Sequence, residues 1–271
     1  MRKLFFGIST FISCVSFAQN DIQTAVFPDG TEVDYQVFSN EIKDMEKLNV
    51  FLEINTRSTL TLGPSVSYTL PEVFISKVHL GFVEKQFGKF SIENTWYFKS
   101  SEKEKSFPIT LKAISNGNTT TKFVTKQPVQ IKKQFGARLG YLSGNYQTDG
   151  LFRVNAKANE LSLGVSYSKT KFIKYKTLSG SKPREHSKFG RTNVYAEMIN
   201  YHAIKNILTD ELDYDYSIIP SKAKTGFRIG LEGQSGNSKF GLSYFLGVET
   251  PLSKLFFIQP FGGVGVYFSF L

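Results

Sequence analysis

Histidine is the residue type in this chain whose side chain most readily moves a proton near neutral pH, and there are three: His79, His186 and His202. None of them belongs to a His-Glu-x-x-His motif, and no Gly-x-Ser-x-Gly is present. We therefore expect no enzyme, no catalytic residues and no cofactor. His79 and His202 are expected on strand faces as ordinary polar residues.

A basic segment spans residues 169–191 and contains eight Lys or Arg residues opposed only by Glu185. In an extended strand Lys174 and Lys176 share one face, with Ile173 and Tyr175 on the other. Lysines at the rim of a membrane protein could hold the phosphates of an anionic glycolipid. The candidate contacts are Lys174, Lys176, Lys182 and Arg184, and the alternative is a solvated loop without a partner.

An acidic run holds Asp210, Glu211, Asp213 and Asp215. Several carboxylates close together could bind calcium, but the run lacks the glycine and terminal Glu of an EF-hand loop. We expect a polar loop and no metal site.

The elements that must position these residues are β-strands, because large apolar side chains alternate with small or charged ones in the C-terminal part. Phe227, Ile229 and Leu231 alternate with glycine and charge, and the same pattern recurs at 242–248 and 264–270. A soluble sheet would cover its second face with Lys, Glu and Thr, whereas here that face is rich in glycine with scattered charges. The pattern is typical of a barrel with an apolar outside and a polar lumen. The residues predicted to line that lumen are Arg138, Arg228, Glu232 and Glu249.

The N-terminal residues have the pattern of a secretion signal, with Arg2 and Lys3 before an apolar run and small residues before Gln19. We expect cleavage after Ala18, a periplasmic or lumen-plugging segment at 19–46, and one β-barrel domain at 47–271. A lipoprotein with Cys14 as the modified residue is the alternative. The net charge of +10 becomes +8 when Arg2 and Lys3 are removed, and it suits an anionic surface or an anion-favouring lumen.

The segment 19–44 contains a turn signal at Pro28-Asp29-Gly30 and a helix signal at 41–47. Beyond it we expect about 12 strands in an all-β, up-and-down antiparallel transmembrane barrel, with 10 to 14 allowed. Prolines within the predicted strands, among them Pro64, Pro128 and Pro260, argue against a regular barrel. The predicted strands are 48–57, 59–69, 77–86, 90–99, 109–114, 121–131, 134–142, 151–158, 160–171, 192–202 and three C-terminal segments.

Together the signal peptide, the strands Gly-Phe-Arg-Ile-Gly-Leu-Glu and Phe-Gly-Leu-Ser-Tyr-Phe-Leu-Gly-Val-Glu, and the ending Gly-Val-Tyr-Phe-Ser-Phe-Leu resemble the bacterial outer-membrane β-barrel proteins. The resemblance covers mainly residues 134–271. It implies the outer membrane of a Gram-negative cell envelope, contact with its lipid and lipopolysaccharide, and recognition of the last strand by the barrel-assembly machinery. Members of the class usually end on an aromatic residue, whereas here Leu271 follows Phe270.

Two non-enzymatic functions remain open within that class: a porin-like passive pore for small solutes, or a structural, assembly or adhesion barrel. A secreted soluble β-barrel that binds a small apolar ligand is an alternative of another class. An outer-membrane lipid hydrolase is less favoured. Such hydrolases place a His two residues before a Ser, and Gly81 stands at that spacing from His79.

Overall fold

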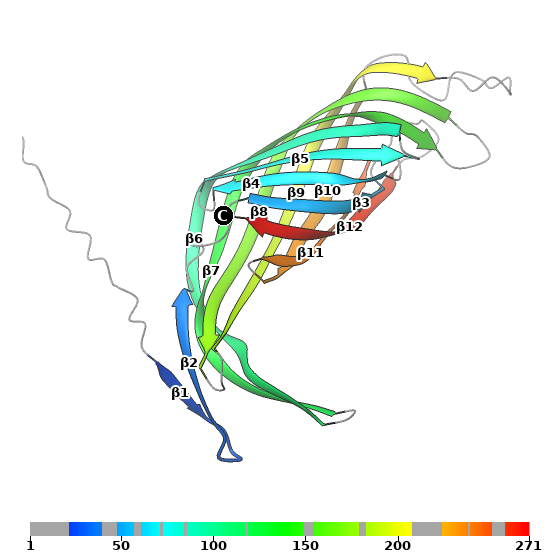
Figure 1. Ribbon diagram of the computed structural model, residues 1–271. Coiled ribbons are helices and arrows are strands. Elements are labelled where there is room, and N and C mark those ends of the chain that lie inside the picture. The colour runs from blue at the N-terminus through cyan, green and yellow to red at the C-terminus, as the bar shows by residue number, and fades with distance from the viewer. Residues whose placement is uncertain are drawn as a thin grey trace, which may run out of the picture.

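The computed structural model describes residues 22–39, 48–56, 61–70, 73–83, 86–116, 119–148, 154–178, 183–207, 224–237, 239–250 and 258–270. Twelve antiparallel strands make up the fold (Figure 1). They are β1 (Gln23–Val26), β2 (Glu32–Ser39), β3 (Leu48–Asn55), β4 (Thr61–Leu70), β5 (Phe74–Val83), β6 (Gln86–Asn116), β7 (Thr119–Thr148), β8 (Val154–Thr177), β9 (Arg184–Ile207), β10 (Lys224–Gly236), β11 (Phe240–Glu249) and β12 (Gln259–Phe270). Within the described residues, no helix is long and apolar enough to cross a bilayer.

Ten of these strands, β3 to β12, close into an up-and-down barrel in which each strand pairs with its neighbours in sequence. Closure is made by β12 and β3, whose partners run from Phe270 opposite Leu48 to Gly263 opposite Asn55. The predicted all-β antiparallel barrel is therefore confirmed. Ten strands form the ring, and the other two, β1 and β2, form a hairpin outside it.

The longest strands differ from the sequence expectation because they absorb segments that were predicted as separate. The segment 109–114 is the end of β6, 121–131 and 134–142 are both β7, and the described part of 151–158, from Val154, and 160–171 are both β8. Polar residues such as Lys132 and Asn159 interrupt the apolar pattern of the sequence. The backbone stays extended through them because the strand that holds each residue is paired with a neighbouring strand on both of its edges. The separate strands were therefore wrong. The barrel expected at 47–271 has ten strands, the lower end of the expected range of 10 to 14.

The prolines that argued against a barrel lie where the sheet tolerates a missing N–H. Pro108 and Pro128 lie in the part of β6 and β7 where neither strand has a second neighbour, and Pro260 precedes the first β12–β3 pair at Gly263. Pro64 pairs with Leu52 on β3, while the β4–β5 ladder skips it between Leu62 and Ser65. Each proline thus has a side without strand pairing.

The outer surface of the ring carries a belt of exposed apolar side chains, which we call the apolar belt. On β11 it comprises Leu242, Leu246 and Val248, and the other strands contribute alternate residues in the same way. The intervening residues are buried and mostly small or polar, as Gly241 and Ser243 show. The predicted division into an apolar outside and a polar inside is therefore present in the described ring. On the other strands the apolar belt includes Leu52, Ile54, Leu62, Val66, Leu80, Phe82, Phe135, Leu139, Leu161, Leu163, Val165, Val194, Met198, Phe227, Ile229, Val264, Phe268 and Phe270.

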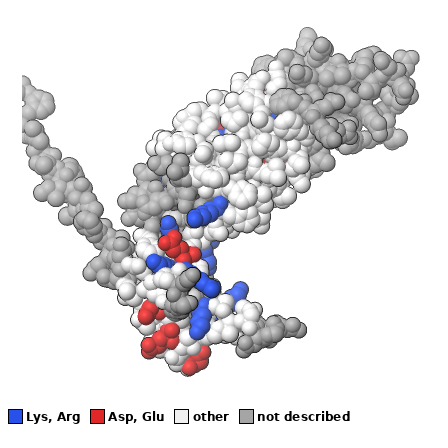
Figure 2. All heavy atoms as spheres, viewed as in Figure 1, with Lys and Arg blue, Asp and Glu red and all other residues white. Residues whose placement is uncertain are grey.

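Beyond the apolar belt, at the end of the ring that holds Leu48 and Phe270, four strands and the β1–β2 hairpin form what we call the extension: residues 22–39, 99–116, 119–130, 171–177 and 184–190. A bulge at Phe98, between the pairs of Tyr97 and Lys99, marks where β6 enters it. Toward the extension, the pairing of β7 with β8 ends at the pair of Ile131 and Lys171. Beyond that pair β8 is joined by β2, which pairs with Lys174 to Thr177. Charged side chains gather on the extension, and the visible face of the ring is nearly free of them (Figure 2).

The extension has an apolar core of its own, built from Val33, Tyr35, Ile109, Leu111, Val129, Ile173 and Tyr175. Ile173 and Tyr175 continue the row of β8 that points outward in the ring, yet here they are buried. The β6–β7 hairpin and β2 cover them. The β1–β2 hairpin turns at the expected Pro28-Asp29-Gly30, where Gly30 has φ 78° and Asp29 accepts a hydrogen bond from the Thr31 amide at 3.0 Å. The helix expected at 41–47 lies outside the described residues.

Closure of the ring can be tested with one engineered disulfide. Val50 on β3 and Phe268 on β12 are direct partners, so their Cα atoms lie within disulfide reach. We expect Val50→Cys/Phe268→Cys, in a chain with Cys14→Ser, to cross-link in the folded protein, as non-reducing gel mobility would show. Val50→Cys/Phe240→Cys is the matched control, because Phe240 lies one strand further away. Equal cross-linking of both pairs would contradict the β3–β12 closure.

Candidate functional site

Alternation along the strands brings the charged residues of the ring to its interior face. Arg138 on β7 follows Gly136 and precedes Gly140, and all three are buried while their neighbours Leu139 and Tyr141 are exposed. Arg228 on β10 stands between exposed Phe227 and Ile229 and is itself 0% exposed. A guanidinium carries its charge under all relevant conditions, so both arginines need partners inside.

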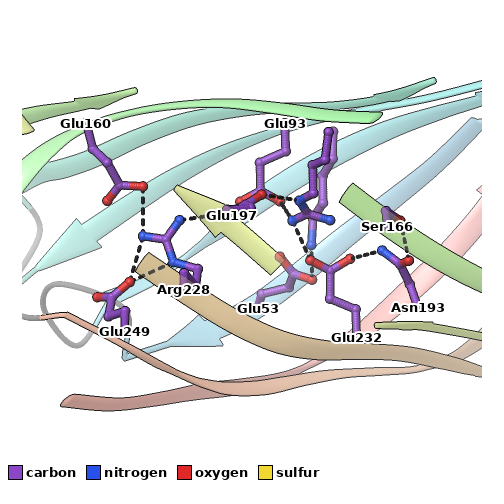
Figure 3. Close-up of polar contacts among 11 residues, drawn as sticks. Glu53, Glu93, Glu160, Ser166, Asn193, Glu197, Arg228, Glu232 and Glu249 are labelled. Atoms are coloured by element: carbon purple, nitrogen blue, oxygen red, sulfur yellow. Dashed lines mark hydrogen bonds and ion pairs between the residues drawn. The ribbon is translucent and has the colours of Figure 1, made fainter. Parts of the chain in front are cut away.

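Arg228 is held by carboxylates from three strands. Its Nη2 lies 2.7 Å from Glu160 on β8 and 2.6 Å from Glu249 on β11, and its Nη1 donates to Glu197 on β9 at 3.0 Å (Figure 3). All three carboxylates are at most 3% exposed. Arg228 therefore ties three strands together in a place that bulk water does not reach.

Arg138 forms a second junction that shares one carboxylate with the first. Its Nε donates to Glu197 at 2.6 Å, and its Nη2 donates to Glu93 on β6 at 2.7 Å and to Glu232 on β10 at 2.6 Å. The Tyr195 ring lies 4.0 Å from its guanidinium carbon. Because Glu197 binds both arginines, the two junctions form one connected cluster, which we call the arginine network.

A third charged group lies on the β3–β5 side of the interior. Glu53 accepts hydrogen bonds from Lys77 Nζ at 2.6 Å and Ser65 Oγ at 2.9 Å, and His79 Nδ1 stands 3.6 Å from it. Between this group and the arginine network lies a cavity of about 90 Å³ lined by Lys77, His79, Arg138 and Glu232 among others.

The glycine-rich rows leave room for this network. A Cβ placed on Gly230 would meet the ring of Tyr195, which packs on Arg138. A Cβ on Gly265 would lie 2.6 Å from the Cγ of Glu53. Glycine at these positions thus gives large interior side chains from neighbouring strands space close to the backbone.

The structure places all four residues predicted to line the lumen on the interior face. Arg138 and Glu232 meet in one junction, and Arg228 and Glu249 meet in the other. Their carboxylate and cationic partners Glu53, Lys77, Glu93, Glu160 and Glu197 were missed. The strand faces could have indicated Glu160 and Glu197, since each alternates with exposed apolar neighbours, but the pairing across the barrel has no signal in a single sequence.

The four residues predicted to contact glycolipid lie elsewhere. Lys174 and Lys176 lie in the extension, where β2 pairs with β8, and the Lys176 ammonium lies 5.9 Å from the Phe38 ring. Arg184 is exposed at the start of β9, and Lys182 lies outside the described residues. The structure therefore brings Lys174 and Lys176 together on the β8 strand, half-buried against the N-terminal hairpin.

The histidines whose side chains the structure describes, His79 and His186, lie apart from each other, one in the ring and one in the extension. His79 is buried inside the ring, and His186 stacks on Tyr175 in the extension at 5.1 Å. No group of three or more His, Cys, Asp or Glu that could hold a metal is found among the described residues. The run from Asp210 to Asp215 and the side chain of His202 lie outside them.

Comparison with known proteins gives little beyond the fold. No family model matches the chain, and no curated protein matches it in sequence. Among solved structures, the anion-selective porin from Comamonas acidovorans aligns at 10% identity and a TM-score of 0.19, over 83% of this chain and 98% of that one. The class is thus given by the architecture itself: a closed antiparallel β-barrel with an apolar outside, which resembles the bacterial outer-membrane barrels.

Removing the shared carboxylate tests the network. Glu197→Ala leaves Arg138 with two carboxylates and Arg228 with two, both arginines still being buried. Breaking a buried ion pair costs about 3–5 kcal/mol, so we expect a loss of that order in the free energy of unfolding. Glu104→Ala on the exposed surface of β6 is the control and should change it by less than about 1 kcal/mol. The measurement is denaturant unfolding followed by tryptophan fluorescence, and equal effects of both variants would contradict the network's role.

Proposed function

We propose that the protein is an integral β-barrel of the outer membrane of a Gram-negative envelope, exported by its N-terminal signal, whose lumen is closed by the arginine network. We propose a non-enzymatic structural or assembly role, and not that of a passive pore. The observation that carries the proposal is the burial of Arg138 and Arg228 among carboxylates drawn from β6, β8, β9, β10 and β11.

The membrane part of the proposal is supported by the inverted polarity of the ring. Large apolar side chains are exposed on every strand of the described ring, with Leu163 63%, Met198 67% and Val264 60% exposed. Soluble monomers rarely expose a contiguous apolar patch above a few hundred Å². On β11 the belt runs from Phe240 to Val248, nine residues, which matches the roughly 9–11 residues that a barrel strand needs to cross a bilayer.

The closed lumen is supported by what fills it. A barrel of about eight strands has an interior just wide enough for its own side chains, and ten strands widen it only modestly. Here guanidinium and carboxylate groups occupy that space, and the cavity beside them has about 90 Å³. A passive pore needs a continuous column of water. The direct contacts between charged side chains inside the ring support a closed lumen.

The polar interior argues against the soluble alternative. A soluble barrel that binds an apolar ligand would turn its apolar face inward, whereas Ser162, Ser166 and Arg228 lie inside and Leu161, Leu163 and Val165 lie outside. The lipid hydrolase is also disfavoured, because His79 points into the ring and has 4% of its side chain exposed. A lipid at the outer surface would not reach it.

Orientation follows from the connections. At the end of Leu48 and Phe270, β4–β5 and β10–β11 are joined by three residues each, whereas at the other end 208–223 join β9 to β10. Bacterial barrels have short periplasmic turns and longer external loops. We therefore assign the extension to the periplasmic side. Contact of Lys174, Lys176, Lys182 and Arg184 with lipopolysaccharide would need the opposite orientation and stays a prediction, as does recognition by the assembly machinery.

A charged residue on the belt tests the membrane location. Leu163→Lys on β8 should lower the free energy of unfolding in liposomes by about 2–4 kcal/mol, because a lysine would face hydrocarbon. Ile114→Lys, on an exposed position of the extension, is the control and should have a small effect. If Leu163→Lys behaved like Ile114→Lys, the belt would face water, and the proposal would be wrong.

Conductance tests the closed lumen. Refolded wild-type protein in a planar bilayer should show no discrete openings, and Arg138→Ala/Arg228→Ala should show them, because both central side chains are removed. Arg184→Ala, which alters an exposed arginine of the extension, should stay silent. Heat-modifiable gel migration of every variant confirms that the barrel is folded. Regular openings from the wild-type protein would establish a pore and overturn the closed state.

A further inference from the structure

A basic groove lies at the boundary between the apolar belt and the extension. We define it by Lys105, Phe107, Lys169, Lys171, Thr192 and Tyr244, which line a volume of about 360 Å³. One wall is the β6–β7 hairpin, which contributes Lys105 and Phe107. The other wall consists of β8, β9, β10 and β11. The groove is larger than the interior cavity, and its charged lining residues are all cationic.

The groove opens on the outer face of the barrel. Lys169 and Lys171 continue the odd-numbered row of β8 whose preceding members, Val165 and Tyr167, are exposed. Thr192 continues the exposed row of Val194 on β9 in the same way. The cations of the groove therefore follow directly after the apolar belt, at the depth where a bilayer changes from hydrocarbon to headgroups.

An aromatic side chain marks the same depth. Tyr167, which is 43% exposed, stands on the row of β8 directly before Lys169, while Tyr244, which is 39% exposed, lines the groove from the apolar belt on β11. Amphipathic tyrosine rings are enriched at membrane–water interfaces because one end is apolar and the other hydrated. The groove thus joins an apolar surface on one side to a polar extension on the other.

No carboxylate of the described residues neutralises the lysines that line the groove, or Lys188, which lies outside the lining but beside its residue Phe107. The ammonium groups of Lys171 and Lys188 lie 4.4 and 5.5 Å from the centre of one ring, Phe107, and Lys188 donates to the Pro108 carbonyl at 3.1 Å. Among the described residues no carboxylate forms an ion pair with Lys105, Lys169, Lys171 or Lys188. Burial first, and then the charges of Lys171 and Lys122, lower the pKa of Lys188.

We propose that the basic groove binds the phosphate of an anionic phospholipid headgroup. Its principal cations are Lys171, which lines the groove, and Lys188, which lies beside the lining residue Phe107, and Lys105 and Lys169 are further lysines of the lining. The acyl chains would then lie on the apolar belt beside Tyr167 and Tyr244. This inference rests on the proposed membrane location. A lipid is favoured over free phosphate because the groove opens beside the apolar belt, where acyl chains add burial that an inorganic ion lacks.

The test uses the full refolded protein in a neutral detergent, with short-chain phosphatidylglycerol, short-chain phosphatidylcholine or inorganic phosphate added at one concentration. The readout is the midpoint temperature of the heat-modifiable gel transition. A ligand at about ten times its dissociation constant should raise the midpoint of a chain of this size by about 3–6 °C. We expect that rise for wild-type protein with phosphatidylglycerol, and no comparable rise with phosphatidylcholine or phosphate.

The variant Lys171→Gln/Lys188→Gln should lose the rise. Lys112→Gln/Lys126→Gln, two exposed lysines of the extension outside the groove, changes the net charge equally and should keep it. Retention of the rise in the groove variant, its loss in the control, or an equal rise with inorganic phosphate would each overturn the lipid site.

The two proposals fail in distinguishable ways. If the protein folds to a heat-modifiable barrel and tolerates Ile114→Lys but not Leu163→Lys in liposomes, the membrane location stands whatever the groove does. Absence of a phosphatidylglycerol effect would then remove the groove proposal alone. A protein with no heat-modifiable form would remove both.

Discussion

Closure of the sheet between β3 and β12 is the constraint on which the rest of the structure depends. A closed ring leaves no strand edge within its span, so the backbone groups are paired inside the sheet and the outward side chains are free to be wholly apolar. Closure also creates an interior whose size is fixed by the number of strands. The arginines can then reach carboxylates two and three strands away, as Arg138 on β7 reaches Glu197 on β9 and Glu232 on β10.

The sequence predicted the outward and inward faces of the strands correctly where apolar and small or polar residues alternate with a period of two. On β10 and β11 the predicted apolar residues Phe227, Ile229, Leu242, Tyr244, Leu246 and Val248 are exposed, and Arg228 and Glu249 are buried. The sequence could not predict which interior side chains form ion pairs with one another, because this depends on which strands meet across the ring and in which register. Glu197 shows the difficulty: its interior row on β9 also holds Tyr195, Ile199 and Tyr201, so that the charge stands among large apolar residues.

The alternation rule fails in the extension for a physical reason. Ile109, Val129 and Ile173 belong to rows that would point away from the barrel, yet they are buried because the β6–β7 hairpin folds over β2 and β8. Two bulges, at Phe98 and Leu111, bend β6 and shift its register by one residue each time. Such register shifts cannot be predicted from a single sequence, so the segments 109–114 and 121–131 were predicted as separate short strands. The N-terminal hairpin completes this core, which explains why β1 and β2 lie outside the ring.

The location of charge separates the barrel from its extension. Inside the ring Lys77, Arg138 and Arg228 contact six carboxylates, those of Glu53, Glu93, Glu160, Glu197, Glu232 and Glu249, while the buried Arg191 donates to Thr170 Oγ1. The excess that gives the whole chain its +10 is therefore not a feature of that interior. It is carried in part by lysines of the extension and the groove, where no carboxylate of the described chain pairs with Lys171 or Lys188. The net charge alone suggested either an anionic surface or an anion-favouring lumen, and the carboxylates around Arg138 and Arg228 favour the first of these expectations.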